Sequence, residues 1–145
     1  MDVTNKIYPD AEQMAGFLEP GPEGPICMVN LLKFKPQAEY ADGRATDLTG
    51  REAYELYEKG VKKLLQGIGG CIGFEGDVER LALGAVEELW DLVALAVWPS
   101  RQAMLEVMQS EGMQEISVHR AAGLAGQLNI ETSGFTGQWL DGESQ

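Results

Sequence analysis

The stretch from Leu89 to Met108 is the feature that most limits how this chain can fold. It reads LWDLVALAVWPSRQAMLEVM, the pattern of a buried strand over residues 89–98 that runs into a helix after Ser100. Side chains alternate across a strand, so both faces of this one are apolar apart from Asp91. A chain of 145 residues has helices enough to cover only one face of the sheet. We therefore expect a second copy of the chain to cover the other face.

The composition restricts the class of protein. No apolar run approaches the ~20 residues of a membrane span, and the first residues lack the apolar segment of a signal peptide, so we expect a cytoplasmic protein with no membrane partner. A net charge of −12 opposes binding to nucleic acid. Cys27 and Cys71 fall in predicted strands without CxxC spacing, which indicates buried, reduced thiols.

The order of the elements predicts an α+β, ferredoxin-like β-α-β-β-α-β domain over residues 26–131, with an antiparallel sheet and two helices on one face. Residues 1–25 form an appendage with a short helix after Asp10, and residues 132–145 form a tail that Trp139 and Leu140 could anchor to a neighbour. The expected strands of the core are 26–35, 71–78, 89–98 and 123–131. The first expected helix begins at the capping box of Thr49 and Glu52 and ends near 67–70, and the second covers 101–110, with a further turn beyond Gly112. With a twofold mate, this domain makes a dimeric α/β barrel.

Several segments together resemble the domain of unknown function 1330 family. They are PICMVNLLKFK at 25–35, GREAYELY at 50–57, GG at 69–70, WDLVALAVWPSRQAM at 90–104 and HRAAGL at 119–124. The resemblance covers residues 25–131 and implies the same dimeric barrel. Similar barrels include cofactor-independent monooxygenases, haem-degrading monooxygenases and muconolactone isomerases. The haem-degrading proteins carry a Trp and a His on the helix after the third strand, and 101–110 has neither.

Three residues are candidates for catalysis, in a pocket expected between sheet and helices with the long loop 36–48 at its mouth. Asn30 interrupts an apolar strand face, and its amide either stabilises a substrate oxygen or ties the strand to a helix. Some monooxygenases of this fold carry a functional Asn on the first strand, which Asn30 resembles in position. His119, the only imidazole, is either a general base or a partner for a helix end or a carboxylate. Asp91 is either a partly buried base or the ion-pair partner of Arg80 or Arg101.

The candidate ligand-binding residues are Tyr54, Trp90, Trp98 and Arg120. Tyr54 lies on the packed stripe of the first core helix, where it belongs to the core or donates its hydroxyl to a ligand. Trp90 and Trp98 flank two small residues on one strand face. Either a flat slot for a ligand lies between them, or neighbouring side chains fill the space as ordinary core packing. We expect no metal and no cofactor, since one His and two unlinked Cys make no ligand set.

Two hypotheses for function follow. In the first, a homodimer binds a small, largely apolar organic molecule and acts as a cofactor-independent monooxygenase or isomerase. In the second, the barrel is a non-enzymatic interaction or stress-associated module, because the usual base, nucleophile and metal ligands are missing from the sequence.

Overall fold

The computed structural model describes residues 2–137. Trp139 and Leu140 lie outside the described residues. The elements are, in chain order, α1 (Ala11–Leu18), β1 (Ile26–Phe34), α2 (Gly50–Gly67), β2 (Cys71–Asp77), β3 (Leu92–Trp98), α3 (Arg101–Met108), α4 (Glu111–Gly123) and β4 (Leu124–Thr132). No helix among residues 2–137 is both long enough and apolar enough to cross a membrane.

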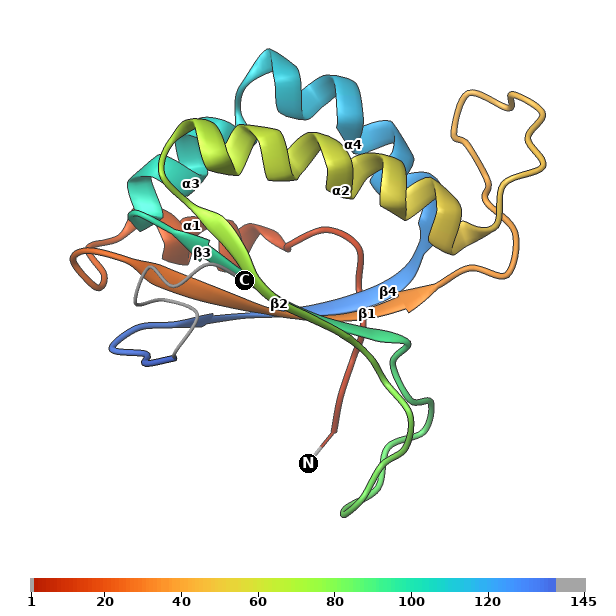
Figure 1. The fold of residues 1–145 in the computed structure, drawn as a ribbon, viewed down its shortest axis with the longest axis horizontal. Helices are drawn as coiled ribbons and strands as arrows, with labels where there is room; N and C mark the ends of the chain where they lie inside the picture. Colours follow the sequence, from red (N-terminus) through yellow and green to blue (C-terminus); the bar gives the residue numbers. More distant parts are fainter. Residues whose placement is uncertain (1, 138–145) are drawn as a thin grey trace.

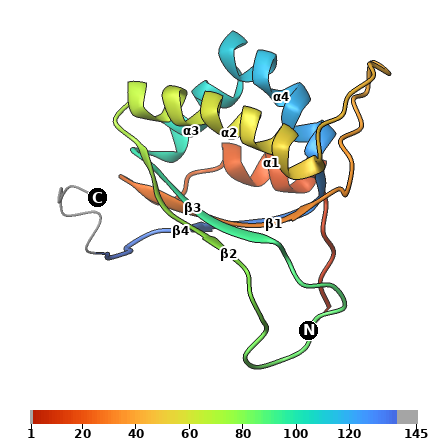
Figure 2. The same cartoon turned by 45° about the vertical axis from the view of Figure 1, so that its right-hand side comes forward.

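The four strands form one antiparallel sheet in the order β2-β3-β1-β4. This is the strand order of the ferredoxin-like fold, so the predicted fold class is confirmed. Helices α2, α3 and α4 lie over one face of the sheet, as Figures 1 and 2 show. The core between the two layers is built from β1, β3 and the inner face of α2, with Ile26, Leu32 and Leu65 fully buried.

Local sequence signals set the ends of the helices. Thr49 accepts a hydrogen bond from the Glu52 N–H, and the Glu52 carboxylate accepts one from the Thr49 N–H, so the predicted capping box starts α2.

Gly60 lets α2 approach α4 closely, because a Cβ there would lie 2.6 Å from Cγ2 of Ile116.

The second helical region differs from its prediction. A helix over 101–110 with one further turn was expected, but α3 stops at Met108 and a longer helix, α4, packs along α2. The cause is Ser110, whose hydroxyl accepts the Met113 N–H and so caps a new helix. Gly112 falls in the first turn of α4 and does not break it.

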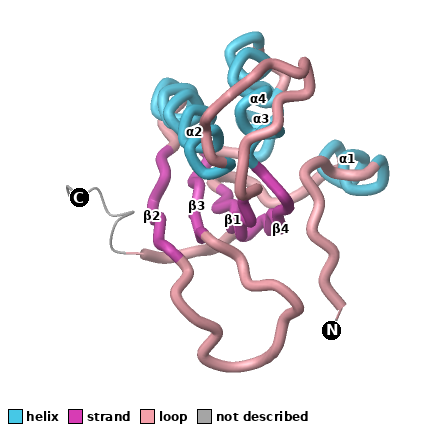
Figure 3. Tube along the Cα trace, turned by 90° about the vertical axis from the view of Figure 1, so that its right-hand side faces the viewer, coloured by secondary structure: helices cyan, strands magenta, loops and turns pink. Residues whose placement is uncertain are grey.

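The central strand also begins later than predicted, at Leu92 rather than Leu89. The Asp91 carboxylate accepts a hydrogen bond from the Phe34 N–H at 2.9 Å and forms an ion pair with Lys33 at 3.3 Å. The Asp91 carboxylate thus binds the Phe34 N–H, while the Asp91 backbone still bonds to Leu32 and Val78. Residues 78–91 form a long loop that projects on the side of the sheet opposite the helices (Figure 3).

The face of the sheet away from the helices, called the outer face, is apolar. Its side chains follow from strand alternation and register: Cys27, Val29, Leu31, Phe74, Val93, Leu95, Val97, Leu128 and Ile130. The prediction that both faces of β3 are apolar is confirmed by its sequence and register. The prediction that both cysteines are buried is wrong for Cys71, which is exposed because it starts the edge strand β2. Both thiols are free, as predicted.

The segment before β1 packs against the opposite edge of the sheet. Lys6 bridges Gln127 of β4, and Asp10 with Gln13 forms the predicted capping box of α1. Figure 3 shows α1 beyond the β4 edge, on the side of the helices.

Candidate active site

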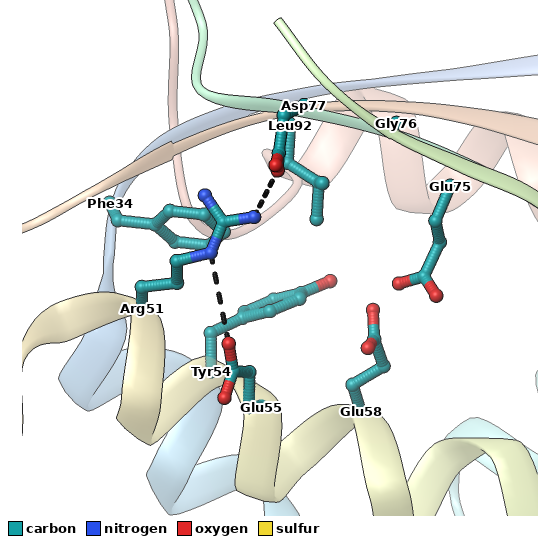
Figure 4. Close-up of a pocket in the computed structure, with 9 residues that line it drawn as sticks. All are labelled: Phe34, Arg51, Tyr54, Glu55, Glu58, Glu75, Gly76, Asp77 and Leu92. Atoms are coloured by element: carbon teal, nitrogen blue, oxygen red, sulfur yellow. Dashed lines mark hydrogen bonds and ion pairs between the residues drawn. The ribbon is translucent and has the colours of Figure 1, made fainter.

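A cavity of about 300 Å³ lies between α2 and the β2 side of the sheet. Figure 4 shows the side chains that line it: Phe34, Arg51, Tyr54, Glu55, Glu58, Glu75, Gly76, Asp77 and Leu92. They come from β1, α2, β2 and the first residue of β3. We call this the α2–β2 cavity. It lies between the sheet and a helix, where the pocket was expected.

Two carboxyl groups, those of Glu58 and Glu75, face each other across the α2–β2 cavity (Figure 4). Their side chains are only 16% and 28% exposed. Burial, then the hydrogen bond and charge of Glu75, raise the pKa of Glu58 to about 7. Burial opposes ionisation of Glu75 too, but hydrogen bonds from Glu58 and Lys62 outweigh it and lower the pKa of Glu75. Below about pH 7 the pair therefore holds a proton, on Glu58.

Lys62 completes this pair from one side. Its Nζ lies 3.1 Å from Oε2 of Glu75 and 3.6 Å from Oε1 of Glu58. Lys62 lies one turn beyond Glu58 on α2, so the helix itself sets this arrangement. The ammonium group favours the ionised form of Glu75, which it contacts more closely.

The Tyr54 side chain is 7% exposed and lines the α2–β2 cavity. Figure 4 shows its hydroxyl directed toward Glu58 and Glu75. No hydrogen bond joins this hydroxyl to another residue within 2–137. Burial, and then the neighbouring Tyr57, raise the pKa of Tyr54, so the phenol keeps its proton. A buried hydroxyl without a protein partner is free to bind a ligand.

Arg51 lies at another part of the wall. Its guanidinium binds Asp77, lies 3.7 Å from Oε1 of Glu55, and stacks over the Phe34 ring at 5.4 Å. Two carboxylates thus compensate its charge. Arg51 ties α2 to the end of β2 and closes that side of the cavity.

Asn30 and Arg120 come together in a second polar cluster, joined by Gln127. The Asn30 amide donates to the backbone oxygens of Met28 and Ala94, each at 3.2 Å, and its Oδ1 accepts from Gln127 at 2.7 Å. Arg120 donates to Oε1 of Gln127 at 2.7 Å and to the Ile7 carbonyl. Ala94 of β3 is the register partner of Glu75 on one side and of Asn30 on the other. Asn30 therefore lies two strands, or about 10 Å, from Glu75. Asn30 and Arg120 do not line the α2–β2 cavity.

His119 lies apart from both clusters. Its Nδ1 is 2.6 Å from the Tyr40 hydroxyl, and Arg44 stacks on the Tyr40 ring. Burial and the positive charge of Arg44 lower the pKa of His119. The contact fastens loop 36–48 to α4. No residue of loop 36–48 lines the α2–β2 cavity. The prediction that this loop forms the mouth of the pocket is therefore wrong for this cavity.

The remaining predicted residues are separated as well. Asp91 pairs with Lys33, not with Arg80 or Arg101, because the latter pairs with Glu131. Trp90 lies before β3 and donates to Asn5 at 2.7 Å, whereas Trp98 is buried in the core. The two tryptophans do not frame a common slot on β3, since Trp90 is not part of the strand.

Of the predicted site residues, only Tyr54 lines the α2–β2 cavity. Sequence reasoning missed Glu58 and Glu75, which come from different elements and look like ordinary solvent-facing carboxylates. A usable signal was Glu75 in a predicted strand, flanked by glycine and phenylalanine. Among residues 2–137 no three His, Cys, Asp or Glu side chains are grouped to hold a metal ion.

Comparison with known proteins assigns a family. No protein-family model matches the chain, and the curated proteins contain no significant match. The chain is similar to a crystal structure of methylated RPA0582 protein, with 33% identity over 94% of this chain and 99% of that one, and a TM-score of 0.83. A second structure, of RPA0582 described as a protein of unknown function from Rhodopseudomonas palustris, gives 31% identity, 92% and 100% coverage, and a TM-score of 0.81. The chain belongs to the family of RPA0582.

A more distant likeness joins the chain to a dimeric ferredoxin-like protein of unknown function from Thermobifida fusca. The identity is 14%, the coverage is 76% of this chain and 91% of that one, and the TM-score is 0.44. At this distance the likeness says nothing about the activity of either protein.

Proposed function

We propose that the protein binds a small, largely apolar organic molecule in the α2–β2 cavity and acts on it as a cofactor-independent enzyme, an isomerase or a monooxygenase. The observation that carries this proposal is the buried Tyr54 hydroxyl, which points into a cavity and has no partner among the described residues. Ligand sites typically combine a mainly apolar wall with a few convergent polar groups.

The size and wall of the cavity support a small ligand. Its volume of about 300 Å³ is at the lower end of the range for ligand pockets. Phe34, Leu92 and the ring of Tyr54 supply apolar surface, Glu58 and Glu75 lie at one side, and the ion pair of Arg51 and Asp77 lies beside Phe34. A compact molecule with an apolar ring and a polar group directed toward Tyr54, Glu58 and Glu75 matches this wall.

We also propose a cytoplasmic homodimer in which the outer faces of two sheets meet. The outer face is apolar across all four strands, and Phe74 and Ile130 on it are 46% and 47% exposed in the single chain. Apolar surface of this extent is typical of a protein interface. The segments that resemble the domain of unknown function 1330 family fall on β1, α2, the turn before β2, β3 with the start of α3, and the junction of α4 and β4, all within the barrel domain, which supports membership of that family.

A non-enzymatic module is the second candidate, and the Asn30 cluster favours it. Asn30, Gln127 and Arg120 satisfy one another and backbone carbonyls, so this cluster needs no ligand. If the protein is an enzyme, we expect its ligand in the α2–β2 cavity and not against Asn30.

Binding can be tested with saturation-transfer NMR on a panel of toluene, cyclohexanone, cyclohexylamine and benzoate. We expect the wild-type protein to bind a member of the panel and Leu92→Phe, which fills the cavity, to lose at least about tenfold in affinity. Leu83→Phe is the matched control, because Leu83 is 89% exposed on loop 78–91. Equal binding by Leu92→Phe and the wild type would place the ligand elsewhere, and no binding at all would favour the non-enzymatic module.

A further inference from the structure

We propose that Glu58, Glu75 and Tyr54 form an acid–base centre that isomerises an uncharged carbonyl compound by moving a proton from one of its carbon atoms to another. The inference rests on the proposed function, because the compound must first occupy the α2–β2 cavity. It goes further by naming the reaction, the class of substrate and the role of each side chain.

The geometry brings three side chains from two elements to one point. Tyr54 and Glu58 lie one turn apart on α2, so both project from the same face of the helix toward the sheet. Glu75 projects from β2, in the row that leads to Ala94. Figure 4 shows the Tyr54 hydroxyl and both carboxyl groups directed toward a common space. An oxygen atom of a ligand in this space can reach all three.

The two carboxyl groups differ in protonation, which gives them different roles. Glu58 is the more buried of the two and carries a proton below about pH 7. Glu75 favours the ionised form because the Lys62 ammonium group contacts it at 3.1 Å. Neighbouring carboxyl groups held in opposite states are the usual arrangement for a general acid beside a general base.

The charges around the cavity select against an anionic substrate. Glu55, Glu75 and Asp77 contribute negative charge, and both nearby cations are already compensated. Arg51 binds Asp77 and Glu55, and Lys62 binds Glu75. No cation on the wall is left to pair with a carboxylate of the substrate. A substrate carboxylate would therefore add a further negative charge to a partly buried, acidic site. A ketone or lactone meets no such repulsion.

The proton transfer balances within the substrate. The ligand carbonyl oxygen accepts hydrogen bonds from Tyr54 and from Glu58, whose proton turns away from Glu75. The freed Glu75 carboxylate takes a proton from the carbon next to the carbonyl, and the electron pair of that C–H bond forms a C=C bond while the oxygen becomes an enolate. Glu75 then returns the proton to the γ-carbon of an unsaturated substrate, and the C=O bond reforms. The double bond has moved, nothing is oxidised or reduced, and both carboxyl groups end as they began.

The test uses 3-cyclohexen-1-one, which becomes the conjugated 2-cyclohexen-1-one and gains ultraviolet absorption. We expect the wild-type protein to accelerate this conversion, Glu75→Gln to lose on the order of 10²–10⁴-fold in kcat/KM, and Tyr54→Phe to lose at least about tenfold. Glu39→Gln on loop 36–48, whose side chain is 75% exposed, is the control and should match the wild type. Circular dichroism of each variant shows that it is folded, and Tyr54→Phe, which removes only an unpartnered hydroxyl, gives a second result if Glu75→Gln does not fold.

The pH profile separates chemistry from simple structural support. Lys62, Arg51, Glu55 and Asp77 are the charged groups that face the pair from α2 and β2. Wild-type activity should fall above about pH 7 as Glu58 loses its proton, whereas Glu58→Gln keeps a neutral donor and should not show this fall. A protein that binds the ketone without converting it, or a Glu75→Gln variant as active as the wild type, would overturn the acid–base centre and leave the binding proposal standing. Conversion that is unaffected by Leu92→Phe would instead count against the proposed site.

Discussion

Replacing Glu58 with Gln should change how the stability of the protein depends on pH. The pKa of Glu58 is raised from 4.5 to about 7, first by burial and then by the hydrogen bond and charge of Glu75. The unfolded chain releases this proton near pH 4.5, whereas the folded protein keeps it until about pH 7. Between these values the folded state binds more protons, so the free energy of unfolding falls as the pH rises.

The magnitude follows from the size of this change. A change in pKa from 4.5 to about 7 corresponds to an upper limit of about 3 kcal/mol. Lys62 is 39% exposed and Glu75 is 28% exposed, so water screens part of the interaction, and we expect about 2 kcal/mol. The lowered pKa of Glu75 acts in the opposite direction, and its stabilisation is lost only as the pH falls below about 4.5. It therefore does not obscure the window from about pH 5 to about pH 8.

The assay is urea unfolding of the wild type and Glu58→Gln across that window. As the pH rises from about 5 to about 8, the free energy of unfolding of the wild type should fall by about 2 kcal/mol relative to that of Glu58→Gln. Glu55→Gln is the matched control, because Glu55 lies one turn earlier on α2 and its side chain is 59% exposed. A difference between wild type and Glu58→Gln that stays constant with pH would show that the two carboxyl groups do not share a proton.

Three further predictions concern the rest of the molecule. Asn30→Ala should lower the free energy of unfolding by about 1–3 kcal/mol, because it leaves Gln127 without its acceptor, and an unchanged urea midpoint would contradict the role of this cluster. Val29→Asp places a charge in the middle of the outer face and should convert a dimer into a monomer in sedimentation velocity, whereas a wild-type monomer would refute the proposed dimer. Tyr40→Phe removes the 2.6 Å contact with His119 and should cost about 1 kcal/mol and speed proteolysis within loop 36–48, and an equal cleavage rate would show that the contact does not fasten the loop.

The fold could be predicted because its signals are local or periodic. The apolar run that became β3, the capping box at Thr49 and the one at Asp10 each fix an element through residues close in sequence. The errors arose where a single side chain acts. Ser110 starts α4 by capping it, and the Asp91 carboxylate binds the Phe34 N–H across the sheet, next to the start of β3. Neither contact leaves a periodic signal.

The candidate site was harder to predict because its groups meet only after folding. Tyr54, which lines the cavity, was one of several aromatic candidates. Glu58 and Glu75 are separated by a helix end and a turn, and a carboxylate on a helix is usually solvent-exposed. Their unusual protonation depends on mutual burial, which sequence spacing does not reveal. Asn30 was expected to bind a substrate or to tie its strand to a helix, but its partners Met28, Ala94 and Gln127 all lie on strands.

A crystal structure of the protein grown with 2-cyclohexen-1-one would test the site most directly. We predict that the ketone lies in the α2–β2 cavity, with its oxygen within hydrogen-bond distance of the Tyr54 hydroxyl and its ring against Phe34 and Leu92. A ketone bound instead beside Asn30, or on the outer face of the sheet, would contradict the assignment of this cavity as the functional site.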